Sequence, residues 1–117
     1  MKALVCGGRH FSDEGFVFQS LDQIHSRTPI SAIIEGGATG ADALARKWAF
    51  ASDIACDTYK ADWTSHGKAA GPLRNQRMID EGKPDLVIAF AGGRGTADMV
   101  RRAKAARLHV IETAPQP

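Results

Sequence analysis

Glycine clusters and nearby basic residues are the parts of this sequence that could do chemistry. Three glycine clusters, at 7–8, 36–40 and 92–95, each follow a short apolar run. Glycine lets backbone N–H groups approach an anion closely, and the start of a helix adds unpaired N–H donors and a favourable dipole. The three loops together predict a bound anionic ligand, and phosphate is the natural candidate.

Basic side chains accompany these loops. Arg9 follows the first cluster, Lys68 and Arg74 surround the start of a predicted helix, and Arg94 lies inside the last cluster. A guanidinium can bind phosphate through two hydrogen bonds. We therefore expect a ligand-binding set made of the loop residues and their neighbours, namely Gly7, Gly8, Arg9, Gly36, Gly37, Thr39, Gly40, Asp42, Arg74, Asn75, Gly92, Gly93, Arg94, Gly95 and Thr96.

Two carboxylates lie near predicted helix starts. Asp42 is three residues after Thr39, the spacing of a capping box, and Asp98 lies in a predicted first helical turn. Asp98 could also orient a ribose or activate a water molecule. If the protein is an enzyme, Asp98 and Arg74 are the expected catalytic residues. The expected helix caps are Ser12 or Asp13, Thr39 and Thr96.

Several function classes find no support in the motifs. The chain has neither GxGxxG after its first apolar run nor GxxxxGK[ST], so hydride transfer and ATP hydrolysis are not expected. The histidines lack metal-ligand spacing, and Cys6 and Cys56 are isolated in or beside apolar runs. We therefore expect no metal and no cofactor, and we expect both cysteines to be reduced core residues.

Charge and hydropathy restrict the partners. A net charge of +2 with no lysine or arginine tract argues against nonspecific nucleic-acid binding. No run approaches the ~20 apolar residues of a membrane span, which predicts no membrane partner and a cytoplasmic location.

The elements that must position these loops alternate between strands and helices, which is typical of a parallel α/β domain. The predicted strands are Lys2–Cys6, Ser31–Glu35, Ala55–Tyr59, Asp85–Phe90 and Leu108–Glu112, and the third has the polar composition of an edge strand. Helices are predicted around 17–24 and 41–49, from Pro72 onward, and over Ala97–Ala106, while 61–71 is predicted to be a long loop. The sequence predicts one domain over 1–114 and a short tail over 115–117.

Four ordered motifs carry a family resemblance over nearly the whole chain. Gly7–Asp13 reads GGRHFSD, Glu35–Asp42 reads EGGATGAD, Gly67–Met78 reads GKAAGPLRNQRM and Gly92–Met99 reads GGRGTADM. Together they resemble the YspA-type branch of the SLOG superfamily. The resemblance implies an α/β, Rossmann-like three-layer sandwich whose five-stranded parallel sheet has the order 3-2-1-4-5. It also implies a nucleotide-related ligand.

A related branch, the LOG phosphoribohydrolases, cleaves a base from a nucleoside monophosphate. Its RKxxM motif is similar to Arg74–Met78, and its PGGxGTxxE motif is similar to Ala91–Met99. Asn75 replaces the lysine, and Met99 takes the place of the catalytic glutamate. Asp98 is one residue away, but one residue on a helix is a rotation of about 100°.

These observations rank three functions. The first is a sensor or binding module for a small nucleotide-derived ligand, which uses every glycine cluster and requires no catalytic base. The second is a nucleotide N-glycoside hydrolase, in which Asp98 or, with less support, Asp42 would polarise water beside Arg74. The third, a single-strand DNA binder, shares the superfamily fold with DprA but lacks an exposed aromatic series. Related proteins commonly pair, so a homo-oligomer is compatible with the resemblance.

Overall fold

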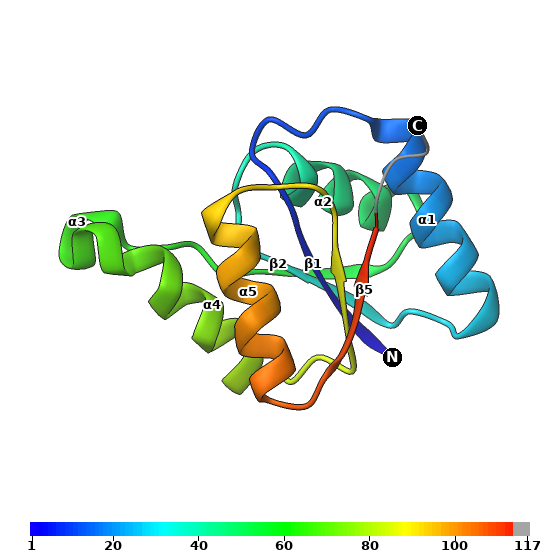
Figure 1. Cartoon of the computed structure of the whole chain (residues 1–117). Helices are drawn as coiled ribbons and strands as arrows, with labels where there is room; N and C mark the ends of the chain where they lie inside the picture. The colour runs from blue at the N-terminus through cyan, green and yellow to red at the C-terminus, as the bar shows by residue number, and fades with distance from the viewer. Residues whose placement is uncertain (114–117) are drawn as a thin grey trace.

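Five parallel strands form the centre of the computed structural model, which describes residues 1–113 (Figure 1). Their spatial order is β3-β2-β1-β4-β5, and this confirms the Rossmann-like α/β fold with β3 at one edge. Each strand end lies within one residue of its predicted position. The predicted tail, 115–117, and residue 114 are outside the described residues. The strands are β1 (Lys2–Cys6), β2 (Ala32–Glu35), β3 (Ala55–Thr58), β4 (Leu86–Ala89) and β5 (His109–Glu112).

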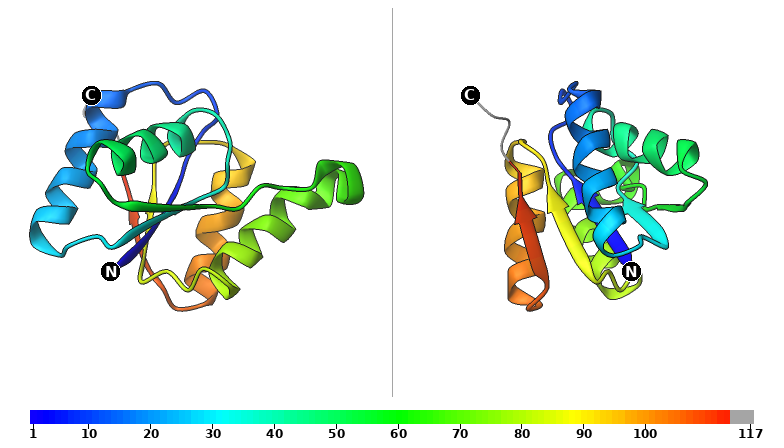
Figure 2. Two further views of the ribbon diagram at one scale, coloured as in Figure 1. Left: turned by 180° about the vertical axis from the view of Figure 1, so that it is seen from behind. Right: turned by 90° about the vertical axis from the view of Figure 1, so that its right-hand side faces the viewer.

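Helices cover both faces of the sheet and complete three layers. Figure 1 and Figure 2 show α1 and α2 on one face, with α4 and α5 on the other. The short α3 projects beyond the edge of the sheet in both figures. The helices are α1 (Glu14–Arg27), α2 (Ala41–Ala51), α3 (Trp63–His66), a 3-10 turn η1 (Gly67–Ala69), α4 (Ala70–Asp80) and α5 (Arg94–Ala105).

Alternate side chains of β1 belong to two separate hydrophobic clusters, one on each face of the sheet. Ala3 and Val5 belong to the cluster beneath α1 and α2, and Leu4 and Cys6 belong to the cluster beneath α4 and α5. Successive side chains of a strand point to opposite faces, so a central strand with two covered faces must be apolar throughout. The near-continuous apolar run of β1 therefore reflects its position in the middle of the sheet.

Helix starts are where the structure departs from expectation. The predicted loop 61–71 contains α3 and η1, and Asp62 caps α3 by accepting a hydrogen bond from the Ser65 N–H at 3.0 Å. Helix α4 begins at Ala70, so Pro72 is its third residue and does not open it. Proline is tolerated there because N–H groups in the first helical turn have no intrahelical acceptor. Helix α5 begins at Arg94, three residues earlier than predicted.

The order of the strands changes direction at β1, because β2 and β3 are added on one side of it and β4 and β5 on the other. Strand β1 pairs with β2 on one side and with β4 on the other, and both pairings are parallel. In open α/β sheets, ligands bind at the carboxyl ends of the strands beside such a switch point. Within residues 1–113, no helix is long and apolar enough to cross a membrane.

Candidate functional site

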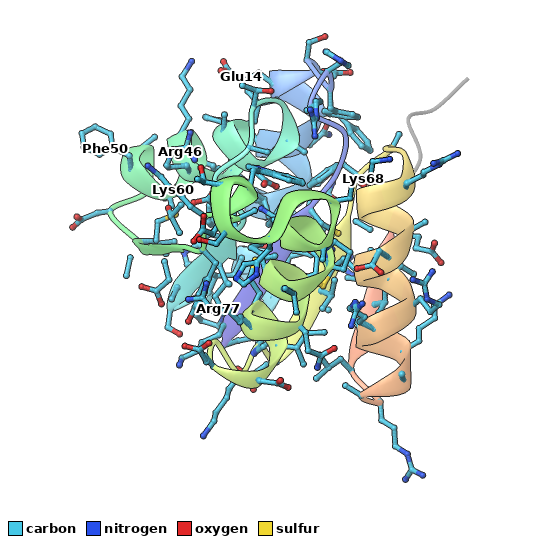
Figure 3. The ribbon with its side chains drawn as sticks, turned by 90° about the vertical axis from the view of Figure 1, so that its left-hand side faces the viewer. Glu14, Arg46, Phe50, Lys60, Lys68 and Arg77 are labelled. Atoms are coloured by element: carbon cyan, nitrogen blue, oxygen red, sulfur yellow. The ribbon has the colours of Figure 1, made fainter. Side chains whose placement is uncertain are left out.

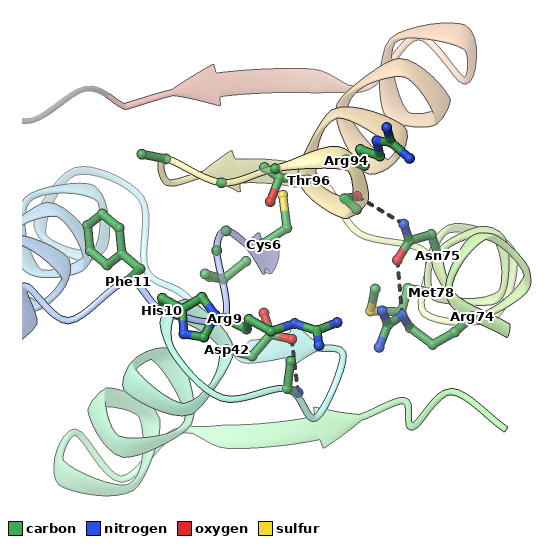
Figure 4. A pocket seen from close by; sticks show the side chains of 18 residues that line it. Cys6, Arg9, His10, Phe11, Asp42, Arg74, Asn75, Met78, Arg94 and Thr96 are labelled. Carbon is green, nitrogen blue, oxygen red and sulfur yellow. Dashed lines mark hydrogen bonds between the residues drawn. The ribbon is translucent and has the colours of Figure 1, made fainter. Parts of the chain in front are cut away.

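A cavity of about 660 Å³ opens at the carboxyl ends of β1 and β4 (Figure 4). We call it the main cavity. It brings together eleven of the predicted binding residues, and its predicted lining residues are Gly7, Gly8, Arg9, Asp42, Arg74, Asn75, Gly92, Gly93, Arg94, Gly95 and Thr96. Gly36, Gly37 and Thr39 lie instead around a neighbouring depression with Lys60 and Trp63. The second glycine cluster, residues 36–40, which we call loop two, therefore contributes less to the main cavity than its glycine content predicts.

The start of α1 is capped by a side chain of the protein. Asp13 is the N-cap, and its Oδ1 atom accepts a hydrogen bond from the Phe16 N–H at 3.1 Å. Gly7 and Gly8 lie well before this cap, and a Cβ on Gly7 would be only 2.6 Å from the Ala41 Cβ. These glycines are therefore explained by close packing of the loop, and α1 offers no open start to an anion.

Two carboxylates accept hydrogen bonds from the backbone N–H groups of loop two. Asp42 Oδ2 accepts hydrogen bonds from the N–H groups of Gly36 and Ala38, both at 3.2 Å. Glu35 is fully buried, and its Oε1 accepts from the Gly37 N–H at 2.7 Å. Three of the five N–H groups of loop two are thus already bonded to carboxylates of the protein. Loop two therefore offers an anion fewer free donors than its glycine content predicts.

The predicted capping box at α2 is absent. The N-cap is Gly40, with φ of +74°, and no side chain caps the helix. The Thr39 hydroxyl donates to the Arg9 carbonyl at 2.9 Å, and the Ala41 N–H donates to the Gly8 carbonyl at 3.1 Å. A Cβ on Gly40 would overlap the Gly8 carbonyl oxygen. The start of α2 therefore packs against the first glycine-rich loop, residues 7–13, which we call loop one.

The start of α5 is different, because its donors are open. Within residues 1–113, the N–H groups of Arg94, Gly95 and Thr96 make no hydrogen bond, and the first bonded N–H belongs to Ala97. A Cβ built on Gly93 or on Gly95 would meet no atom within 4 Å. Packing of the chain does not explain glycine at these two positions. The arrangement leaves unpaired donors and empty space at the edge of the main cavity, which suits an anion.

Thr96 is the third residue of α5 and is not its cap, which is Gly93. The Thr96 side chain contributes to the cavity wall, to which Cys6 also belongs (Figure 4). A Cβ on Gly92 would overlap the Thr96 hydroxyl oxygen and would lie 2.7 Å from the Gly8 nitrogen. Gly92, unlike Gly93, is therefore required by the packing of the loop.

Arg74 extends from α4 into the main cavity (Figure 4). Its Nη1 donates to the Gly36 carbonyl at 2.6 Å and its Nε donates to Asn75 Oδ1 at 3.0 Å, while Nη2 has no hydrogen bond among the described residues. Burial lowers the pKa of Arg74 from its ordinary value, against the charges of Asp42 and Glu35. The guanidinium remains a cation at neutral pH. It is held in place with one edge free for a ligand.

Asp42 is the carboxylate of the main cavity. Burial, assisted by the charge of Glu35, raises its pKa from 3.8 to about 6, although the Ala38 and Gly36 N–H groups and Arg74 favour its ionised form. A carboxyl with a pKa near neutrality can exchange a proton under working conditions. The structure therefore gives Asp42 a chemical character that its spacing from Thr39 did not indicate.

Replacing Asp42 with asparagine is expected to remove a pH dependence of stability. The folded state holds the Asp42 proton up to pH about 6, whereas the unfolded chain releases it near 3.8. The free energy of unfolding of the wild type should therefore fall as pH rises through this window, by roughly 2–3 kcal/mol from this group. Asparagine retains an oxygen that accepts the two N–H bonds. Urea unfolding at pH 4.5 to 7.5 measures the difference, and Asp57→Asn, at an exposed position, should not reproduce it.

Asp98 does not face the main cavity. Its carboxylate accepts hydrogen bonds from Arg101 at 2.7 Å, from Arg102 at 2.8 Å and from the Asn75 amide at 3.0 Å. Burial by itself raises the pKa of Asp98, but these hydrogen bonds and the two arginine charges bring it below its ordinary value. Next in sequence, Met99 is fully buried in the cluster beneath α4 and α5. Asp98 is thus a firmly ionised partner of arginines.

Seven further residues of the cavity wall were missed from the sequence, and four of them bear on its chemistry or shape. His10, Phe11, Cys6 and Met78 line the main cavity beside the polar residues. Phe11 packs at tilted angles against Phe16 and Phe90, which holds the end of loop one in place. Burial raises the pKa of the Cys6 thiol to about 12, so it is not a nucleophile at neutral pH. Within residues 1–113, no three His, Cys, Asp or Glu side chains are grouped to hold a metal ion.

Two comparisons with known proteins agree with each other. Residues 1–66 match the profile of the YAcAr family, described as the YspA, cpYpsA-related SLOG family. The chain is also similar to the Gene 61 protein of Mycobacterium phage D29, with 36% identity over 125 aligned positions that cover 99% of this chain and 98% of that protein. The profile match ends before α4, whereas the similarity to the phage protein extends over the whole cavity.

Proposed function

Because the chain belongs to the YspA, cpYpsA-related SLOG family, we propose that it binds a nucleotide or nucleotide-derived phosphate in the main cavity as a sensor or binding module. The family resemblance implies a nucleotide-related ligand. The position of the main cavity at the switch point between β1 and β4 supports the same conclusion.

One observation carries this proposal. Of the three glycine-rich loops, the last leads into the helix with the most open start, because the N–H groups of its first three residues are all unpaired within residues 1–113 and these residues line the main cavity. In contrast, Asp13 caps α1, the first N–H group of α2 donates to loop one, and three N–H groups of loop two are bonded to Asp42 and Glu35. The ligand phosphate is therefore assigned to the start of α5, with Arg74 and Arg94 beside it.

The rest of the main cavity suits a nucleoside. Phe11, His10 and Met78 provide ring and apolar surface for a base, and Asp42 provides an acceptor for a sugar hydroxyl. A cavity of about 660 Å³ falls within the range of small-molecule sites. The polar side chains come from the loop after β1 and from α2, α4 and α5, and polar groups that converge from several elements fix the orientation of a ligand.

Thermal unfolding in the presence of nucleotides tests the proposal. A ligand at one hundred times its Kd adds about 2.7 kcal/mol to the free energy of unfolding. For a domain of this size, that corresponds to a rise in Tm of roughly 10 °C. The panel should contain nucleoside monophosphates, nucleoside diphosphates, ADP-ribose and the matching nucleosides. A rise that requires the phosphate supports the assignment, and an unchanged Tm across the panel contradicts it.

A nucleotide N-glycoside hydrolase is the second candidate, and the position of Asp42 is what favours it. Asp42 lies in the main cavity beside Arg74 with a pKa of about 6, so it could accept a proton from water near an anomeric carbon. Asp98, the carboxylate first expected for this role, is bonded to three partners away from the main cavity. Chromatographic detection of free base after incubation with nucleoside monophosphates tests this activity. Release that Asp42→Asn abolishes supports it, and binding without release contradicts it.

A further inference from the structure

A second compartment adjoins the main cavity. It has a volume of about 550 Å³ and shares five lining residues with the main cavity, namely Arg9, Arg74, Asn75, Arg94 and Gly95. Beyond this shared boundary it extends between α5 and the segment of α3, η1 and α4, where Trp63, Lys68 and Arg101 line it. The two cavities therefore adjoin along these five residues, and one ligand long enough to pass them would contact both.

The second compartment has more positive charge than one phosphate can balance. Among residues 1–113, five basic side chains line it, and Asp98 is the only carboxylate in its wall. Asp98 is itself bonded to Arg101 and Arg102. Arg9, Lys68 and Arg94 make no ion pair among the described residues. A single phosphate monoester carries a charge of about −1.5 to −2 at neutral pH, so cations remain unmatched.

We propose that the second compartment binds a second phosphate, so that the ligand of this protein is a nucleoside joined to a pyrophosphate. The inference rests on the proposed function, because the first phosphate is the one at the start of α5. The second phosphate lies past the boundary residues, within reach of Lys68 and Arg101. Figure 3 shows Lys68 on the side of the α3 to α4 segment that is nearer to α5.

Two kinds of ligand would carry this pyrophosphate, namely a free nucleoside diphosphate and a nucleotide whose pyrophosphate is joined to a further group. The two differ in whether they would contact Trp63. Its side chain is 54% exposed and forms a wall of the second compartment, next to Gly71, where a Cβ would lie 3.3 Å from the indole ring. An exposed indole can pack against a sugar or a base. A bridged ligand would use this surface, and a free diphosphate would not.

Binding constants for ligands that differ by one phosphate test the inference. In the wild type, ADP is expected to bind about tenfold more tightly than AMP, because one charge-assisted contact contributes about that factor. The same comparison with GMP and GDP covers a different base. In Lys68→Ala the advantage of the diphosphate should fall to about twofold while the Kd of the monophosphate stays unchanged. Lys68 is exposed and makes no side-chain bond among the described residues, so its replacement should not disturb folding.

Lys47→Ala is the control for net charge, because it removes one exposed lysine charge from α2, away from both cavities, together with an exposed ion pair to Glu14 that contributes little to stability. Equal affinities for mono- and diphosphates in the wild type overturn the inference and leave the proposed function intact. Equal weakening of both ligands by Lys68→Ala also overturns it. Absence of binding by every nucleotide removes both proposals together. Tighter binding of ADP-ribose than of ADP that Trp63→Ala abolishes identifies a bridged pyrophosphate, and equal binding identifies a free diphosphate.

Discussion

Replacing Gly95 with alanine is expected to make the protein slightly more stable and to weaken nucleotide binding about thirtyfold. Gly95 is the second residue of α5, and a Cβ there would meet no atom within 4 Å, so alanine adds helix propensity without a clash. The gain is about 0.5 kcal/mol in free energy of unfolding. The same methyl group would enter the empty space of the main cavity, which Gly95 lines beside the open N–H donors. If it displaces the phosphate from these donors, the loss of charge-assisted hydrogen bonds costs about 2 kcal/mol of binding energy.

Gly15→Ala is the control for this effect. Gly15 is the second residue of α1, and a Cβ there would have only an ordinary contact with Asp13 at 3.8 Å. It should raise stability in the same way and leave the Kd unchanged. Chemical unfolding and calorimetric titration measure the two quantities. Retention of wild-type affinity by Gly95→Ala would show that the ligand does not approach the start of α5.

Replacing Arg74 with alanine is expected to have the largest effect on binding, a loss of about a hundredfold. Arg74 is a half-buried cation of the main cavity whose Nη2 edge is free, and hydrogen bonds between charged partners contribute about 1.5–3 kcal/mol. The folded state should also lose about 1 kcal/mol, because the Gly36 carbonyl would lose its donor. Calorimetric titration well below the Tm of the variant separates the loss of binding from the loss of stability.

Arg77→Ala provides the comparison on the same helix. Arg77 pairs with Glu81 at 3.0 Å, packs over the Tyr59 ring and lines neither cavity. It removes the same charge from the protein, so any effect of net charge on anion binding should appear in both variants. Similar affinities in Arg74→Ala and Arg77→Ala would mean that Arg74 serves only to hold loop two. Lysine at position 74 should restore part of the affinity, because it keeps the charge without the planar fork.

The sheet could be predicted closely because its determinants are local. Each strand is a short run with a clear apolar or edge composition, and the four motifs indicate the family from which the strand order follows. The short helix α3 could not be predicted from periodicity, because four residues do not complete a repeat. Its signal was Asp62 three residues before Ser65, the spacing of an N-cap and its donor.

The glycine loops were predicted as three similar anion sites, and the sequence could not distinguish them. An aspartate near a helix start is equally suited to cap the helix, to accept bonds from a neighbouring loop or to face a ligand. Asp42 takes the second role because loop two folds back over it and brings N–H groups four and six residues earlier in the chain to its carboxylate. Position 98 presented the same difficulty, since its arginine partners are on the next turn of α5 and Asn75 is on α4.

The peptide of Gly8 joins the two halves of the sheet. Its N–H donates to the Ala91 carbonyl at 2.9 Å, and its carbonyl accepts from the N–H groups of Phe11 and Ala41 at 3.1 Å. The main cavity therefore cannot exist before β4, which pairs with β1 across more than eighty residues, has joined the sheet. Such distant pairings form late in folding. A nucleotide in this cavity would consequently bind only the completed native state, slowing unfolding without accelerating the early steps of folding.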